Sequence, residues 1–244
     1  MVFVDCYWEL ENIGKRTCEI SYEEGETFDE VDFLNKTQGF EYIVVKVPMS
    51  QLSINLGLAK LGFVMMETQI NISKNYQQFN FEDRLIRILY PHVEEQIVTS
   101  DSDFNRILSK ITPNMFSTDR IYLDTYFNND ISRKRYTNWM KTEYQNKTSV
   151  FKKIIYKGED VGFGMLREEN GIIHGLLGGV YELKQSEGIG ILTACSGFLT
   201  AHKNNTPFKK VVTAISSNNI PMLQIYNYLQ FKIDRMTYVF VKHK

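Results

Sequence analysis

The sequence has few of the residues that bind metals or form disulfides. Its three cysteines, Cys6, Cys18 and Cys195, form no close pair, and its four histidines do not join them at metal-ligand spacing. Disulfide frameworks and zinc sites need such clusters, so we predict reduced cysteines and no metal site. A basic segment followed by an apolar one, as in a secretory signal, is also missing near residue 1. These absences predict a cytoplasmic protein.

An excess of one charge and long apolar runs are missing as well. The 28 Lys and Arg residues are balanced by 29 Asp and Glu residues, whereas sequence-independent nucleic-acid binding relies on a surplus of basic side chains. No run approaches the roughly 20 apolar residues that cross a membrane as a helix. We therefore predict that the protein binds no nucleic acid and has no membrane span.

The chain does contain enough apolar material for a packed core. Hydrophobic residues make up 43% of its 244 residues, and at roughly 100–200 residues per domain this length predicts one large or two small domains. Strand-like and helix-like segments alternate, which is typical of the α/β and α+β classes. The polar segment 74–78 interrupts this alternation. We therefore predict a domain of residues 1–78 followed by a domain of residues 79–244.

Two parts of the chain show a similar order of elements. A strand at Val45, a helix and a second strand after Phe63 resemble a strand at Val212, a helix and a second strand after Phe231. The first interval is 18 positions long and the second is 19. Because any strand–helix–strand unit can look like this, two interpretations stay open: a coincidence, or a degenerate half-copy followed by a complete copy.

The segment most indicative of chemistry is Gln185-x-x-Gly188-x-Gly190, which lies between a predicted strand and a predicted helix. Glycines at a helix N-terminus let the backbone N–H groups approach an anion closely, and the helix dipole favours a phosphate there. The dinucleotide-binding Gly-x-Gly-x-x-Gly pattern and the Gly-Lys-Ser/Thr of a P-loop are both absent. The segment therefore predicts a pyrophosphate site of another kind, with ordinary turn formation as the alternative.

Residues further along the chain narrow this prediction. Asn219, Tyr226 and Phe231 follow in the order Asn-x6-Tyr-x4-Phe on a predicted strand–helix–strand unit. Together with the glycine segment, this pattern resembles the Gcn5-related N-acetyltransferase (GNAT) superfamily, although Gln230 stands where that family usually has Gly. The resemblance implies an α/β (α+β) GNAT fold with a central mixed, mostly antiparallel sheet. It also implies acetyl-CoA (coenzyme A) as cosubstrate, without a metal.

The segment from Trp8 to Arg16 resembles the opening of the sugar-nucleotide N-acetyltransferases of the dTDP-fucosamine acetyltransferase type. That group carries a truncated GNAT-like domain before the complete GNAT domain, which matches the similarity between the two parts of this chain. The resemblance implies that residues 1–78 form such a truncated domain. It also implies that the acceptor is a nucleotide-linked amino sugar.

The resemblance assigns cofactor-binding and catalytic residues. Backbone N–H groups near Gly179 and Val180 would polarise the thioester carbonyl, as in an oxyanion hole. Tyr226 would act as general acid, because a phenol with a reference pKa of about 10 is protonated at neutral pH; the alternative is an aromatic core residue. The pyrophosphate and the pantetheine arm would be bound by Gln185, Ser186, Glu187, Gly188, Ile189, Gly190 and Asn219, and the alternative for Asn219 is an ordinary N-cap.

His174 is the candidate general base. It stands at even spacing from Leu176, Gly178 and Val180, which places the four residues on one face of a regular strand. In some GNAT enzymes a carboxylate acts as base from this strand, and an imidazole with a reference pKa near 6.5 suits the same task. The alternatives are a structural or substrate-binding histidine, or Glu168 and Glu169 as the base.

The acceptor is the least defined part of the prediction. Five residues between the predicted domains could hold a nucleobase or a diphosphate: Arg120, Tyr122, Tyr126, Arg133 and Arg135. The GNAT fold does not name its amine, so an amino acid, a polyamine or an aminoglycoside is an alternative acceptor. A CoA-binding module without turnover is a second alternative. A homodimer is one oligomeric state that the sequence leaves open.

Overall fold

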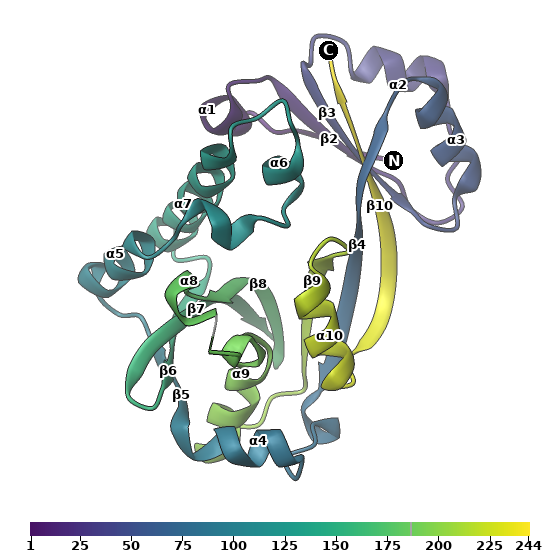
Figure 1. Cartoon of the computed structure of the whole chain (residues 1–244). Coiled ribbons are helices and arrows are strands. Elements are labelled where there is room, and N and C mark those ends of the chain that lie inside the picture. Colours follow the sequence, from purple (N-terminus) through teal and green to yellow (C-terminus); the bar gives the residue numbers. More distant parts are fainter. Residues whose placement is uncertain (186) are drawn as a thin grey trace.

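The computed structural model describes residues 1–185 and 187–244, without the side chains of Leu183 and Gln185. The described strands form one ten-stranded sheet (Figure 1). In order across the sheet they are β1 (Val2–Asp5), β2 (Thr17–Ser21), β3 (Tyr42–Pro48), β10 (Lys232–His243), β4 (Val64–Asn75), β9 (Lys210–Ser216), β8 (Ile172–Val180), β7 (Glu159–Glu169), β6 (Val150–Tyr156) and β5 (Val93–Ile97). The pairs β2–β3 and β8–β9 are parallel and the others antiparallel. The predicted mixed, mostly antiparallel sheet is therefore confirmed.

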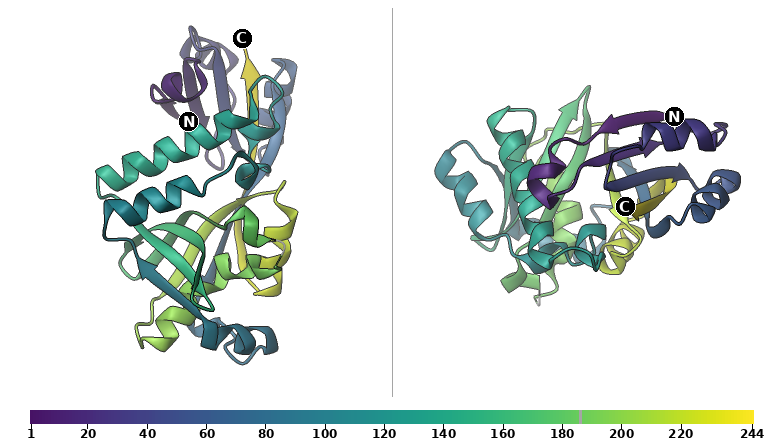
Figure 2. Two further views of the ribbon diagram at one scale, coloured as in Figure 1. Left: turned by 60° about the vertical axis from the view of Figure 1, so that its left-hand side comes forward. Right: turned by 90° about the horizontal axis from the view of Figure 1, so that it is seen from above.

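Helices cover both faces of the sheet (Figures 1 and 2), because consecutive apolar residues of a strand point to opposite faces and make both of them apolar. On β3, for example, Ile43 and Val45 pack toward α2 and α3, whereas Tyr42 and Val44 pack toward α6. One face carries α2 (Glu30–Lys36), α3 (Leu52–Lys60), α4 (Arg84–Leu89), α9 (Leu192–Lys203) and α10 (Ile220–Tyr228). The other carries α1 (Glu9–Ile13), α5 (Asp101–Ser109), α6 (Arg120–Leu123) and α7 (Asn129–Gln145). None of the described helices is long and apolar enough to cross a membrane.

The remaining helices are short. They are the 3-10 helices η1 (Tyr76–Gln78), η2 (Tyr90–His92), η3 (Pro113–Phe116) and η4 (Ile189–Ile191), and the helix α8 (Glu182–Gln185). Lys74 and Asn75 belong to β4 and the next three residues to η1. The segment 74–78, where the sequence analysis places the domain boundary, thus consists of the end of β4 and of η1.

The similarity between the two strand–helix–strand units is a structural repeat. Adding 168 to the bounds of β3, α3 and β4 gives the bounds of β9, α10 and β10. The pairing register follows the same rule, because Val47 lies opposite Tyr238 and the equivalent Ile215 lies opposite Ile70. Val44 therefore corresponds to Val212, and the two units have equal length. The predicted difference of one residue came from aligning Val45 with Val212.

The two repeated units exchange their last strands. β10, from the second unit, pairs with β3 of the first, and β4, from the first unit, pairs with β9 of the second. β4 and β10 also pair with each other and run side by side through the length of the molecule (Figure 1). Residues 1–78 and 79–244 thus contribute to one continuous sheet, and their division into two domains stays a prediction.

Gln230 adopts the backbone conformation of the glycine that it replaces. Its φ is 56°, and Gly62, its equivalent in the first unit, has a φ of 78°. A left-handed conformation costs an L-residue about 1–2 kcal/mol, partly offset by the greater unfolded-state entropy of glycine. We therefore expect Gln230→Gly to raise the free energy of unfolding by about 0.5–1 kcal/mol, measured by urea denaturation.

The reverse change provides the control for this prediction. Nothing lies within 4 Å of a Cβ built on Gly62, so Gly62→Gln adds backbone strain without a steric clash. It should lower the free energy of unfolding by a similar amount. Shifts of the same sign in both variants would contradict the argument.

Candidate active site

A cavity opens where two parallel strands separate. β8 and β9 pair only over Ile172–Gly175 and Lys210–Thr213, yet β8 continues to Val180 and β9 to Ser216. The resulting cavity has a volume of about 1160 Å³ and extends between the sheet, α10 and α7. Its wall includes residues from the ends of β8 and β9, the N-cap of α10 and the last turn of that helix: Leu176, Leu177, Gly178, Gly179, Val180, Ala214, Ile215, Ser216, Asn219 and Tyr226. The predicted catalytic acid and part of the predicted cofactor site therefore share one cavity.

His174 does not lie where the alternation of a regular strand would place it. Between the pairs Met165–Leu177 and Leu166–Gly175 the register shifts by one residue, which marks a β-bulge. A bulge of one residue reverses the face on which the following side chains point. His174 therefore points to the opposite face from Val180, and the expectation that both share one face is wrong. His174 also does not line the cavity, so its role as base stays a prediction without support from this geometry.

The glycine-containing loop lies between β8 and α9, as predicted. Gly188 has a φ of 70°, a conformation that favours glycine, and it leads directly into η4 and α9. Gly190 lines the cavity, whereas the side chain of Ile189 is buried in the core. Ser186 lies outside the described residues, as does the side chain of Gln185. The described part of the loop thus presents backbone at the start of α9, where a phosphate would bind.

Charged residues of this loop bind one another. Glu187 is exposed, and its carboxylate lies 2.9 Å from Lys184 Nζ. Lys184 also lies 2.5 Å from the Glu159 carboxylate on β7. The two carboxylates neutralise the Lys184 ammonium, so backbone N–H groups rather than this side chain would have to bind a phosphate.

Asn219 serves as the N-cap of α10. Its Oδ1 accepts a hydrogen bond of 3.2 Å from Met222 N. The same residue lines the cavity. Because the cap uses only Oδ1, the Nδ2 donors stay available for a ligand, and the structural and ligand-binding interpretations of Asn219 are compatible.

Tyr226 stands on α10 between the core and the cavity. Its ring packs edge-on against Phe231, with a centroid distance of 4.8 Å, and next to Met222 and Ile215. Burial raises the pKa of Tyr226 to about 12, so the hydroxyl keeps its proton at neutral pH. Among the described residues the hydroxyl has no hydrogen-bond partner. This arrangement suits a group that donates its proton to a ligand in the cavity.

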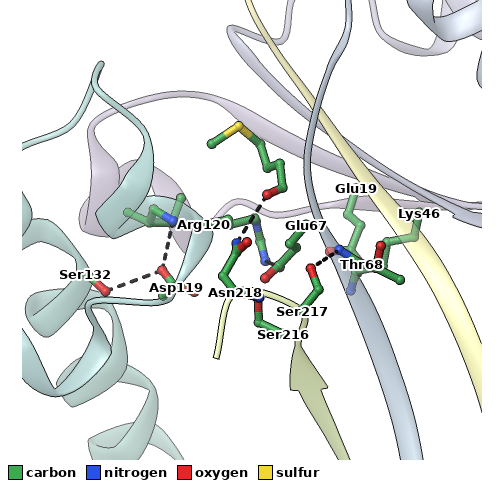
Figure 3. A network of polar contacts seen from close by, with 12 residues as sticks. Glu19, Lys46, Glu67, Thr68, Asp119, Arg120, Ser132, Ser216, Ser217 and Asn218 are labelled. Atoms are coloured by element: carbon green, nitrogen blue, oxygen red, sulfur yellow. Dashed lines mark hydrogen bonds and ion pairs between the residues drawn. The ribbon is translucent and has the colours of Figure 1, made fainter. Parts of the chain in front are cut away.

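The opposite wall of the cavity holds charged residues, most of which the sequence did not single out. Arg120 on α6 reaches toward Glu67 on β4, and Asp119 lies beside them (Figure 3). Arg135 Nε donates a hydrogen bond of 2.6 Å to Glu9 Oε1. Glu67 was missed because no motif marks it, and the exchange of strands alone brings β4 beside β9.

Three residues of the predicted acceptor region lie outside this wall. Arg133 is bound to Asp130 at 2.7 Å on the exposed side of α7. Tyr126 stacks on His243, and the Tyr122 hydroxyl donates to Asn114. None of the three lines the cavity. Of the predicted acceptor residues, only Arg120 and Arg135 are part of it.

Comparison with known proteins identifies the fold. No protein-family model and no curated protein matches the sequence. A GCN5-related N-acetyltransferase from Sphaerobacter thermophilus matches the structure with a TM-score of 0.54 at 10% identity, over 87% of this chain and 64% of that chain. A tandem GNAT protein from the clavulanic acid biosynthesis pathway matches with a TM-score of 0.52 at 11% identity, over 93% of this chain and 75% of that chain.

A third structure, a GCN5-related N-acetyltransferase from Kribbella flavida, matches with a TM-score of 0.53 at 9% identity, over 93% of this chain and 80% of that chain. At such low identities the likeness concerns the backbone and not the residues of the site. The chain thus has the fold of the GCN5-related N-acetyltransferases.

Proposed function

We propose that the protein is an acetyl-CoA-dependent N-acetyltransferase that acts on a primary amine of a small molecule. The observation that carries this proposal is the cavity between the separating ends of β8 and β9, bordered by Tyr226 and Asn219. From Leu176 to Gly179 the β9-facing side of β8 pairs with no strand among the described residues. An extended pantetheine arm has amide groups that can pair with such a strand edge.

Residues in and beside the cavity supply three functions of acyl transfer: they bind the cosubstrate, polarise its carbonyl and protonate its thiolate. The fourth function, removal of a proton from the attacking amine, is the role that the sequence predicts for His174. Acetyl-CoA would bring the acetyl thioester and its phosphates. Gly188 and Gly190 present backbone N–H groups to a pyrophosphate, and the N–H near Gly179 polarises a carbonyl oxygen. The Tyr226 hydroxyl donates a proton to a departing thiolate. Asn219 Nδ2 binds a carbonyl of the extended arm.

We add four more specific hypotheses to this proposal. A nucleotide-linked amino sugar as acceptor, a truncated GNAT-like domain at residues 1–78, a homodimer and a cytoplasmic location all come from the sequence and its resemblance. The structural repeat supports the truncated domain, because residues 1–78 repeat only β9, α10 and β10, the last elements of residues 79–244. The identity of the acceptor is open to direct measurement.

The proposal is tested by thiol release from acetyl-CoA. We expect release with at least one amine in a panel of nucleotide-linked amino sugars, amino acids, polyamines and aminoglycosides. Release with a nucleotide-linked amino sugar alone would support the narrower hypothesis. Acetyl-CoA binding, measured by calorimetry, without release from any amine would favour a CoA-binding module. Absence of acetyl-CoA binding would refute the proposal.

A further inference from the structure

On the wall of the cavity opposite Tyr226, one ion pair is too long for a direct hydrogen bond, and we call it the open ion pair. Arg120 Nη1 lies 3.8 Å from Glu67 Oε1, beyond hydrogen-bond distance. Both side chains are largely buried, with exposed fractions of 13% and 10%. Arg120 Nε is buried without a hydrogen-bond partner, and Glu67 has no other partner among the described residues. A buried donor that lacks a partner costs about 1–3 kcal/mol, so this arrangement favours a ligand or water that completes it.

Neighbouring charges on the same wall are already satisfied. Arg135 binds Glu9 at 2.6 Å. Asp119 accepts hydrogen bonds from the Tyr136 hydroxyl at 2.8 Å and from Ile121 N at 2.9 Å. Of these charged residues, Arg120 and Glu67 thus form the pair whose contact is longer than a hydrogen bond.

Glu67 is held in place relative to the proposed catalytic residues. Its neighbours on β4 bind the loop that precedes α10: Asn218 Nδ2 donates to Met66 O at 3.3 Å, and Thr68 N donates to Ser217 Oγ at 2.9 Å (Figure 3). The next residue, Asn219, begins the helix that carries Tyr226. These hydrogen bonds thus connect the strand that carries Glu67 to the helix that carries Tyr226, which faces Glu67 across the cavity.

From this arrangement we propose that Arg120 and Glu67 form a subsite for an acceptor whose amine lies next to a carboxylate, as in an α-amino acid. The guanidinium binds the carboxylate through paired N–H donors. The Glu67 carboxylate binds the amine in its ammonium form, before the base removes the proton that the amine must lose to attack the thioester. Two opposite charges 3.8 Å apart match the two charges of such a zwitterion, which are separated by one carbon. This inference rests on the proposed acetyl-transfer function, and it favours an α-amino acid as acceptor over the nucleotide-linked amino sugar that the sequence resemblance implies.

The first test compares matched acceptors in the thiol-release assay. Each α-amino acid is paired with the amine that lacks its carboxylate, and phosphoethanolamine represents an amine with a phosphate. We expect kcat/KM to be at least tenfold higher for the best amino acid than for its matched amine. Equal values for the two would overturn the subsite, while acetyl transfer itself would stand. A preference for phosphoethanolamine would overturn the carboxylate assignment.

The second test uses variants and a readout without turnover. Arg120→Gln should raise the KM of the amino acid at least tenfold and leave the KM of acetyl-CoA unchanged. The KM of the amino acid for Arg120→Lys should lie between the values for the unaltered protein and for Arg120→Gln. Arg87→Gln, at an exposed surface pair on α4, is the matched control. Calorimetry of amino-acid binding to the protein saturated with CoA should show the same loss for Arg120→Gln. Absence of binding to the unaltered protein would overturn the inference.

A double variant separates binding from folding. Removing one charge leaves the other buried and unpaired, which can destabilise the protein. Arg120→Gln combined with Glu67→Gln removes both charges, and we expect a Tm within a few degrees of the unaltered protein. This variant should lose the preference for the amino acid over its matched amine. Retention of the preference would overturn the proposal. Failure to bind acetyl-CoA in the unaltered protein would instead refute the proposed function.

Discussion

Tyr226→Phe is expected to lower kcat by about 10²–10⁴-fold, the range that general acid–base groups contribute. The substitution removes only the hydroxyl, which has no hydrogen-bond partner among the described residues, and keeps the ring packed 4.8 Å from Phe231. The fold and the cofactor cleft should therefore persist. Thiol release under saturating acetyl-CoA measures kcat, and calorimetry should show an acetyl-CoA affinity within a few fold of the unaltered protein.

Tyr228 offers a control on the same helix. Its side chain is exposed, and its hydroxyl donates to Asp83 at 2.8 Å, away from the cavity. Tyr228→Phe should leave kcat unchanged. If Tyr226→Phe retained full turnover, Tyr226 would be a core aromatic and another group would protonate the thiolate.

Glu143→Gln is expected to lower the free energy of unfolding by about 2 kcal/mol, because a buried carboxylate loses hydrogen bonds that depend on its charge. Arg167 Nη2 lies 2.7 Å and 2.8 Å from the two carboxylate oxygens, and the Thr148 hydroxyl donates at 2.7 Å. This cluster ties α7 to β7. At about 2–4 °C per kcal/mol, Tm should fall by about 4–8 °C.

The effect should depend on pH in a defined direction. Burial would raise the pKa of Glu143, but hydrogen bonds from Arg167, Ser149, Thr148 and Trp139 outweigh it and lower the pKa to about 2. The unfolded carboxyl titrates near 4.5. The stabilisation is therefore complete above pH 4.5 and is lost as the pH falls toward 2.

Urea denaturation at pH 7, 5 and 3.5 measures this dependence. The difference between the unaltered protein and Glu143→Gln should be constant from pH 7 to 5 and smaller at pH 3.5. Glu169→Gln, at an exposed position of β7, should leave the free energy of unfolding unchanged at each of the three pH values. A difference that grew on acidification would show that the Glu143 cluster does not stabilise the charged carboxylate.

The local order of elements could be predicted from the sequence because it depends on nearby residues. The strand at Val45 is a nearly continuous apolar run that ends at Pro48, and the helix after it ends shortly before Gly62, so both elements end at residues suited to turns. The glycine loop at Gly188 was found from spacing alone. The order of Asn219 and Tyr226 indicated the GNAT resemblance, and the resemblance in turn predicted the mixed sheet.

Other features depend on single residues or on distant pairing. The bulge at β8 shifts the register by one residue, so the parity that assigned His174 to the face of Val180 fails. Nothing in the residues around Leu176 marks that bulge. Glu67 and Arg120 lie 53 positions apart, and only the pairing of β4 with β9 brings the first of them to the cavity.

The exchange of β4 and β10 also sets an order for folding during synthesis. β3 and β4 leave the ribosome early, but the strand that lies between them, β10, is made only after residue 231. Until then β3 and β4 each present an unpaired edge, and edges of this kind are prone to association. Contacts across nearly the whole chain also slow folding. The nascent protein should therefore depend on chaperones more than a GNAT domain in which adjacent strands pair in sequence.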